Sequence, residues 1–173
     1  MQTTFRTFLI RIWVASCCMA LSSASLAQEQ PAGRVILEIS GAISQFNGDN
    51  VMRYDRDMLE ALGLHEITTD TPWTDGPVTF RGVLARDLLA DVGATGTDIE
   101  AIALNDYSVE IPVMDFDTYG VILALQKDGE YLTVRDRGPL WVIYPWSDVT
   151  DLQNELYYSR SIWQLRAIDV RPN

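Results

Sequence analysis

Residues 138–145 constrain the fold of this 173-residue chain more than any other stretch. They read Gly-Pro-Leu-Trp-Val-Ile-Tyr-Pro, an apolar and aromatic run with a proline near each end. Proline fixes its own φ angle and has no backbone N–H to donate to a strand ladder, so each proline bounds the run. An apolar run of this length between turn signals is typical of a buried strand. We therefore predict a buried strand at residues 138–144, against which the remaining elements pack.

Short segments with β-branched residues or an alternating pattern predict further strands. These segments lie at residues 35–39, 65–71, 78–81, 99–104, 107–111, 121–125, 131–134 and 162–170. The Asn105-Asp106 pair predicts the turn of one hairpin, and Lys-Asp-Gly at residues 127–129 predicts the turn of another. Gly82 is expected to end the strand that precedes it.

Two segments have helical patterns. Asp57 and Glu60 resemble a capping box, which predicts a short helix that ends near Gly63. Leucine and valine recur at helical spacing through residues 83–92, which predicts a second helix closed by Gly93. The chain has neither a repeat nor a domain linker. We expect a single α+β domain of mostly short, mixed strands with two or three short helices.

The N-terminal residues have the pattern of an export signal. Arg6 and Arg11 form a positive n-region, residues 12–21 an apolar h-region, and Ser25-Leu26-Ala27 a cleavage site. The pattern divides the chain into a signal peptide at residues 1–27, a flexible tether at 28–33 and a folded domain at 34–173.

This signal indicates a periplasmic or secreted protein. Its two arginines are not adjacent, which favours Sec-type export of an unfolded chain over the twin-arginine route. The apolar run is too short to span a bilayer, so no stable membrane insertion is expected. Val-Ala-Ser-Cys at residues 14–17 resembles a lipobox, and cleavage there as a lipoprotein is the less favoured alternative.

Composition excludes several function classes. Cys17 and Cys18 are the only cysteines, and both lie in the signal, so the mature chain would have no disulfide, thiol nucleophile or thiolate metal ligand. The net charge is −11 and becomes more negative once the signal's arginines are removed. Such an acidic protein repels nucleic acid and anionic lipid. A partner is expected to be neutral or cationic, or to bind at a local exception to the overall charge.

Catalytic and metal-binding patterns are weak. His65 is the single histidine, and no serine occupies a strand-turn-helix elbow, so neither a catalytic triad nor a zinc site is supported. Asp115 and Asp117 suit acid/base chemistry or a hard cation, but calcium-loop spacing is absent, and a solvated loop is the favoured interpretation. The acidic residues of 147–155 are interpreted in the same way. No catalytic or metal-ligating residue is predicted.

Aromatic residues and arginines gather in the second half of the chain. Two interpretations stay open: a pocket for a flat, conjugated or anionic ligand, or a core filled by aromatic rings with arginines that neutralise nearby carboxylates. The residues concerned are Trp73, Tyr144, Trp146, Tyr157, Tyr158, Trp163, Arg135, Arg137 and Arg160.

A series of short motifs in order carries a family resemblance. The chain resembles the oxidoreductase molybdopterin-binding domain, which has the sulfite-oxidase fold, and is most similar to a short exported bacterial branch named molybdopterin-dependent oxidoreductase. The motifs are TPWTDG at 71–76, FRGV at 80–83, DLL at 87–89, GA at 93–94, ALNDY at 103–107, EIP at 110–112, DG at 128–129, RGPLWVIYP at 137–145 and SIWQL at 161–165.

The chain departs from that family at the metal ligand. The resemblance implies that catalytic members ligate molybdenum through a cysteine thiolate on the strand before the tryptophan that Trp73 matches. Thr69 falls at or next to that cysteine position, and a threonine hydroxyl is not a soft anionic ligand. The resemblance therefore implies a retained fold with lost metal chemistry, which leaves open whether the protein is an enzyme.

From these features we expect a non-catalytic protein that binds a small anionic or aromatic ligand, or an envelope protein such as a membrane sensor, in a sensing or accessory role. The alternatives are an oxidoreductase that holds molybdopterin without a cysteine ligand, and a structural domain without a pocket. The resemblance places the pocket at the family's cofactor position, edged by Thr69, Trp73, Asn105, Asp106, Tyr107, Arg137, Trp146 and Arg160.

Overall fold

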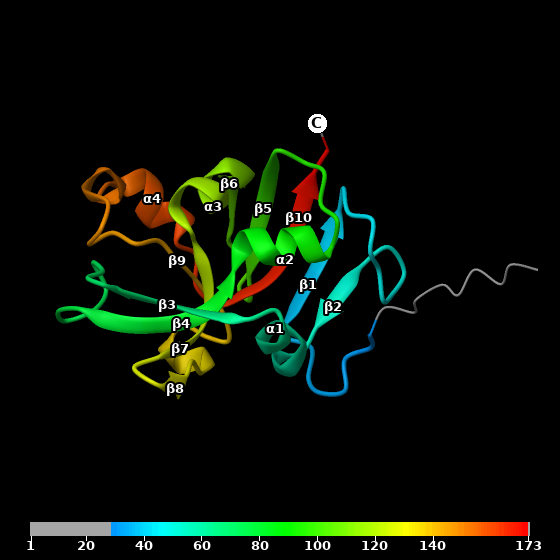
Figure 1. The fold of residues 1–173 in the computed structure, drawn as a ribbon, viewed down its shortest axis with the longest axis horizontal. Coiled ribbons are helices and arrows are strands. Elements are labelled where there is room, and N and C mark those ends of the chain that lie inside the picture. The colour runs from blue at the N-terminus through cyan, green and yellow to red at the C-terminus, as the bar shows by residue number, and fades with distance from the viewer. Residues whose placement is uncertain (1–28, 173) are drawn as a thin grey trace, which may run out of the picture.

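A computed structural model describes residues 29–172, which form a mixed α+β fold with two five-stranded sheets and four α-helices (Figure 1). This confirms the fold class expected from the sequence. The predicted signal peptide lies outside the described residues. Residues 29–33 contain no helix or strand, and Gln30 Nε2 donates a hydrogen bond to the Asn47 carbonyl (2.8 Å). No helix of the described part is long and apolar enough to cross a membrane.

The first sheet joins the two ends of the described chain. Its strand order is β2-β1-β10-β5-β6, in which β1 and β10 are parallel and the other neighbours are antiparallel. The β5–β6 pair is the hairpin predicted around Asn105-Asp106. The strands are β1 (Leu37–Gly41), β2 (Met52–Tyr54), β5 (Asp98–Ala103), β6 (Ser108–Pro112) and β10 (Leu165–Arg171).

The second sheet is antiparallel and contains the strand predicted from the proline-bounded run. Its order is β3-β4-β7-β8, and β9 also pairs with β7. The strands are β3 (Leu64–Thr69), β4 (Val78–Leu84), β7 (Ile122–Lys127), β8 (Glu130–Tyr131) and β9 (Trp141–Ile143). Short 3₁₀ turns at Val134–Asp136 and Thr150–Leu152 flank β9.

The helices are short, with six or seven residues each. They are α1 (Arg56–Ala61), α2 (Ala85–Asp91), α3 (Val113–Tyr119) and α4 (Glu155–Arg160). Helix α2 contacts β4 and α3, while α4 contacts β6 of the other sheet. Figure 1 shows α3 and α4 on the same side of the molecule as β9.

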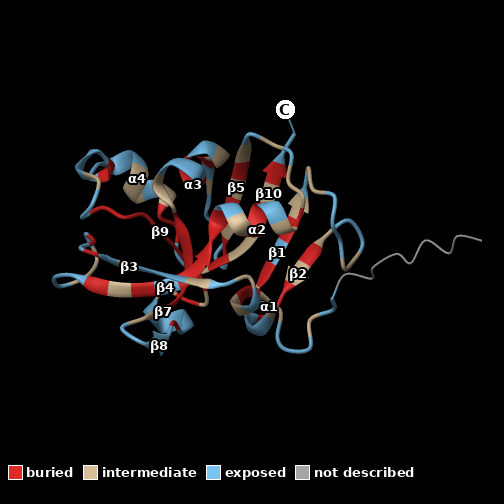
Figure 2. Cartoon of the chain, in the orientation of Figure 1, coloured by how far each residue is buried: buried red, intermediate tan, exposed pale blue. Residues whose placement is uncertain are grey.

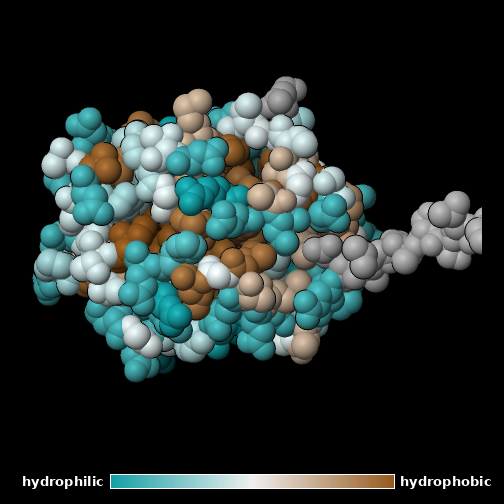
Figure 3. Space-filling view, viewed as in Figure 1, coloured by the Kyte–Doolittle hydropathy of each residue, from teal (hydrophilic) through white to brown (hydrophobic). Residues whose placement is uncertain are grey.

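Strand β9 is buried, as predicted. All three of its residues are at most 1% exposed, and Trp141 also forms a bridge with Trp163 just before β10. Its prolines lie outside the paired segment, and the Gly138-Pro139 peptide bond is cis. In Figure 2 the buried residues run along β9 and the central strands. The surface in Figure 3 is mostly hydrophilic, and hydrophobic residues show mainly in the middle of that face.

Gly82 does not end a strand, contrary to the prediction. Strand β4 continues through Gly82 to Leu84, with a register irregularity between Arg81 and Gly82. A Cβ atom at Gly82 would lie 2.0 Å from the Leu123 carbonyl oxygen of β7. Gly82 therefore permits a close approach of the two backbones within the sheet.

Two segments predicted as loops contain helices. Residues 113–119 form α3, in which Asp115 is only 8% exposed, so the expected solvated loop is wrong. The acidic segment 147–155 contains a 3₁₀ turn and leads into α4, whose N-cap is Asn154. Residues 132–134, predicted as strand, follow a much shorter β8.

The cap of α1 is Asp55, whereas the sequence pattern indicated Asp57. The Asp55 carboxylate accepts hydrogen bonds from the backbone N–H groups of Met58 (3.0 Å) and Gly33 (2.7 Å). These backbone donors, Met58 first and then Gly33, lower the pKa of Asp55 from its ordinary value. One carboxylate therefore both starts the helix and fixes the segment that precedes β1.

We expect Asp55→Ala to lower the free energy of unfolding by about 1–2 kcal/mol, because it removes the helix cap. Asp57→Ala is the matched control, since Asp57 is exposed, and it should change stability by less than about 0.5 kcal/mol. Urea unfolding of both variants measures the difference. Equal losses in the two variants would contradict the assignment of the cap.

Candidate functional site

Thr69, at the end of β3, is closed off from solvent. It is 0% exposed, and its Oγ1 accepts a hydrogen bond from the Ser147 backbone N–H (2.9 Å) and donates one to the Ser147 hydroxyl (3.1 Å). The same hydroxyl accepts from the Asp70 backbone N–H (2.8 Å). Within residues 29–172, no three His, Cys, Asp or Glu side chains are placed to hold a metal ion. The Thr69 position is therefore filled by the chain itself.

Trp73 is the centre of an aromatic cluster. Its ring centroid lies 5.4 Å from that of Trp163, 5.8 Å from Trp141, and 6.0 Å from both Trp146 and Tyr158. These distances are those of edge-to-face and tilted ring pairs, which stabilise a cluster beyond the area that they bury. The aromatic residues noted in the sequence thus do come together.

A cavity of about 450 Å³ opens on one side of this cluster. It lies between α4, the turn of the β5–β6 hairpin and the segment that leads into β10. Trp73, Asn105 and Tyr107 are the predicted pocket residues that line it. The other lining residues are Ala103, Glu155, Tyr158, Ser159, Ser161, Ile162 and Trp163.

Asp106 belongs to the same turn, but it is not among the residues that line the cavity. It is exposed, has a positive φ of 65°, and pairs with Arg166 (Nη2 to Oδ1, 2.6 Å). Asn105 instead stabilises the turn, because its Oδ1 accepts a hydrogen bond from the Tyr107 backbone N–H (3.2 Å). The turn therefore directs one acidic side chain into an ion pair and presents Tyr107 to the cavity.

Arg137 packs against the outside of the aromatic cluster. Its guanidinium carbon lies 5.1 Å from the ring centroid of Trp141 and 5.5 Å from that of Trp163, within the range of cation–π contacts. Its carbonyl accepts a hydrogen bond from the Gln164 backbone N–H (2.9 Å). Arg137 is absent from the lining of the cavity.

Trp146 is a core residue and does not edge the cavity. It is 1% exposed and packs against Trp73, Tyr144 and Tyr158. Its Nε1 has no hydrogen-bond partner among the described residues, which costs free energy in a buried position. Its carbonyl accepts a hydrogen bond from Gln153 Nε2 (2.8 Å).

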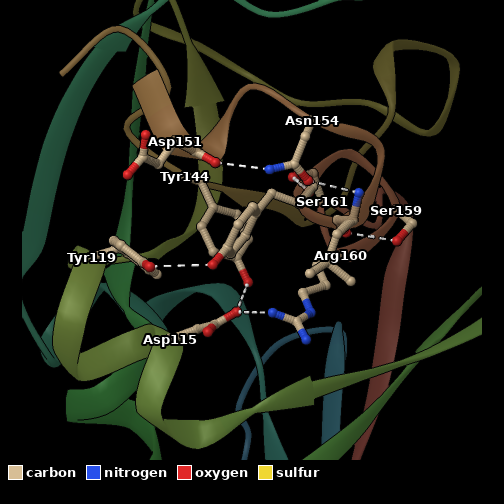
Figure 4. A network of polar contacts seen from close by, with 10 residues as sticks. Asp115, Tyr119, Tyr144, Asp151, Asn154, Ser159, Arg160 and Ser161 are labelled. Carbon is tan, nitrogen blue, oxygen red and sulfur yellow. Dashed lines mark hydrogen bonds and ion pairs between the residues drawn. The ribbon is translucent and has the colours of Figure 1, made fainter. Parts of the chain in front are cut away.

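Arg160, at the end of α4, is engaged in a nearly buried network shown in Figure 4. Its Nη1 lies 2.9 Å from Asp115 Oδ2, and the two side chains are 15% and 10% exposed. The Tyr144 hydroxyl donates to the same oxygen (2.9 Å). The guanidinium also lies 5.4 Å from the Tyr157 ring centroid. Both arginines predicted for an anion site thus have partners within the fold.

Burial, the Asp115 carboxylate and a hydrogen bond between tyrosines disfavour ionisation of the tyrosines in this network. Burial, followed by the Asp115 carboxylate, raises the pKa of Tyr144 far above its ordinary value. The hydrogen bond with Tyr119 (3.2 Å), followed by burial, raises the pKa of Tyr157 to about 12. Both side chains are therefore neutral at ordinary pH.

The prediction missed the contribution of α4 to the cavity. Glu155, Tyr158 and Ser159 follow the i, i+3, i+4 spacing of a single helix face. Asn154 as N-cap, with its side chain accepting from the Leu156 backbone N–H (3.0 Å), is the signal that indicates this helix. A hydrophobic periodicity is absent because the helix is less than two turns long.

A second, larger hollow of about 710 Å³ is lined by residues of β1, α1 and β8, among others. Its lining mixes charges of both signs, including Arg34, Arg56, Asp57 and Arg166. Arg56 lies over the Tyr131 ring (4.1 Å). None of the eight predicted pocket residues lines this hollow.

Comparison with known proteins shows the fold. The structure is similar to the sulfane dehydrogenase SoxCD from Paracoccus pantotrophus, with a TM-score of 0.60 and 16% sequence identity. The match covers 79% of this chain and 38% of that chain, so this chain spans about two fifths of its length. No protein-family model and no curated protein matches the sequence. The likeness supports a distant relation in fold to the oxidoreductase molybdopterin-binding domain that the motifs indicated.

Asp115→Asn should destabilise the protein by about 3–5 kcal/mol, because it leaves the Arg160 charge nearly buried without its carboxylate. Asp117→Asn on the same helix is the matched control. Because Asp117 is exposed, this substitution should change the free energy of unfolding by less than about 0.5 kcal/mol. Chemical unfolding of both variants at pH 7 measures the two effects. If Asp115→Asn leaves the free energy of unfolding unchanged, the ion pair contributes nothing to stability.

Stability should fall with rising pH above the ordinary tyrosine pKa of 10.0. The folded state raises the pKa of Tyr157 to about 12 and that of Tyr144 further, so it holds protons that the unfolded chain releases. The stabilisation is complete below pH 10 and is lost as pH rises through the folded values. Tyr144→Phe should flatten this decline, measured by urea unfolding at several pH values, whereas Tyr107→Phe, outside the network, should leave it unchanged.

Proposed function

We propose that this protein is a non-catalytic member of the sulfite-oxidase fold, which binds a small ligand in the aromatic cavity between α4 and the β5–β6 turn. The observation that carries the proposal is the cavity of about 450 Å³ walled by Trp73, Tyr107, Tyr158 and Trp163. Its size and its mixture of rings with a few polar groups are those of small-molecule sites. A ligand bound there lets the protein act as a sensor or accessory protein.

The donor set of the site supports the absence of metal chemistry. The fold family implies a molybdopterin cofactor whose metal is held by a soft thiolate, but this chain offers the hydroxyl of Thr69 at or next to that position. That hydroxyl is already bonded to Ser147 and is buried. The lining of the cavity also contains no lysine or arginine to bind the phosphate of a pterin cofactor. The residues present therefore do not fit this cofactor.

The N-terminal pattern supports a further part of the proposal, which is that the protein works in the periplasm or outside the cell. Residues 1–27 carry the positive n-region, the apolar h-region and the small residues of a cleavage site. We expect mass spectrometry of the exported protein to show a mature chain that begins at Gln28. A lipid-modified Cys17 at the N-terminus would support the lipoprotein alternative instead.

A thermal-shift screen of small aromatic compounds, with neutral, anionic and cationic members, tests the ligand site. We expect bound compounds to raise Tm in the native protein and to lose this effect in Trp163→Ala and Tyr107→Ala, because both side chains line the cavity and are at least 37% exposed. Tyr131→Ala, an exposed tyrosine of the other hollow, is the control and should keep the shift.

Metal analysis of protein purified from its native envelope completes the test. We expect no stoichiometric molybdenum and no released pterin fluorescence. Stoichiometric molybdenum would overturn the non-catalytic proposal and favour an oxidoreductase that holds its cofactor without a cysteine ligand. If no compound raises Tm in a way that is lost in Trp163→Ala, the proposed ligand site is overturned.

A further inference from the structure

Four aromatic residues, Trp73, Tyr107, Tyr158 and Trp163, line the cavity. The Trp73 ring is inclined by 77° to both Trp163 and Tyr158, at centroid distances of 5.4 and 6.0 Å. Rings at such angles pack edge to face, so they do not form a flat stack. Tyr107 contributes a fourth ring from the β5–β6 turn and is 50% exposed. Because the face of an aromatic ring carries the negative part of its quadrupole, the exposed rings of Tyr107 and Trp163 can attract a cation.

The charge of the lining has a single sign. Glu155 is the one ionisable carboxylate among the lining residues, and no lysine, arginine or histidine accompanies it. Glu155, Tyr158 and Ser159 lie on the same face of α4, so the carboxylate stands one helical turn from a wall of the cavity. The whole chain has a net charge of −11, which adds to the negative potential of the site.

The arginines that would favour an anion are engaged elsewhere. Arg160 is paired with Asp115 at 2.9 Å, and Arg137 lies over Trp141 and Trp163 without lining the cavity. An anionic ligand would therefore meet Glu155 without a compensating cation. Of the small anionic or aromatic ligand expected from the sequence, the lining therefore favours the aromatic part and disfavours the negative charge.

We propose that the cavity is an aromatic cage for a small molecule that bears an ammonium group, either quaternary or protonated, with Glu155 as its counter-charge. The inference rests on the proposed function in that the same cavity binds the ligand, and it adds the chemical class. A cavity of about 450 Å³ accepts such a group together with a modest apolar body.

A comparison of three compounds tests this inference. Choline and benzyltrimethylammonium carry the ammonium group, and 3,3-dimethylbutan-1-ol is the uncharged isostere of choline. Binding to the full mature chain is followed by tryptophan fluorescence and calorimetry. We expect choline to bind about tenfold or more tightly than its isostere, since only the cation gains from the ring faces and from Glu155. Affinity for choline should fall as salt is raised, because an exposed carboxylate is screened.

Glu155→Gln separates the charge from the shape of the cavity. We expect this variant to lower the affinity for choline by about fivefold and to leave the affinity for the isostere unchanged. Glu130→Gln, which removes the same charge from exposed β8, is the control and should preserve choline affinity. Trp163→Ala should lower the affinity for both choline and benzyltrimethylammonium.

Two different failures are distinguishable. If neither cation binds, or if the isostere binds as tightly as choline, the ammonium inference is overturned. Neutral or anionic compounds that bind and lose their effect in Trp163→Ala would then preserve the ligand site itself. If no compound of any charge binds through Trp163, the proposed function fails as well.

Discussion

The ion pair between Asp115 and Arg160 ties down the helix that forms one wall of the cavity. It joins α3 to the last residue of α4, and Tyr144, just after β9, donates to the same carboxylate oxygen. Removing two charges from water costs free energy, which this geometry offsets through direct contact and an additional hydrogen bond. Helix α4 has only six residues and would not be stable alone. Tertiary contacts of this kind therefore hold the helix face that supplies Glu155, Tyr158 and Ser159.

The elements that the sequence predicted well are those fixed by local chemistry. The run between Pro139 and Pro145 became the buried strand β9, and Asn105-Asp106 became a hairpin turn with Asp106 at a positive φ. Asp115 and Asp117 show the limit. They are two residues apart in α3, yet one is buried against Arg160, 45 positions later, and the other is exposed. Only long-range packing distinguishes them, and sequence spacing does not contain that information.

The same limit applies to the candidate site. Trp73, Asn105 and Tyr107 line the cavity, while Thr69 and Trp146 are buried in the core, and Asp106, Arg137 and Arg160 engage other side chains. Aromatic composition indicated that a cluster would form, but not which rings would keep a free face. Gly82 is a similar case, since the backbone of β7 at Leu123, 41 residues away, determines its role.

Thr69 illustrates why a shared fold does not by itself establish a shared chemistry. A fold shared with a dehydrogenase at 16% identity constrains the arrangement of the strands, whereas activity resides in particular side chains. Ser147 donates to the Thr69 hydroxyl and accepts from it, so the end of β3 is joined to the segment after β9 and is closed. The cavity beside Trp73 is lined by aromatic residues and by Glu155, without a lysine, arginine or histidine. The side chains that line such a cavity, and not the fold itself, therefore determine which ligand it prefers.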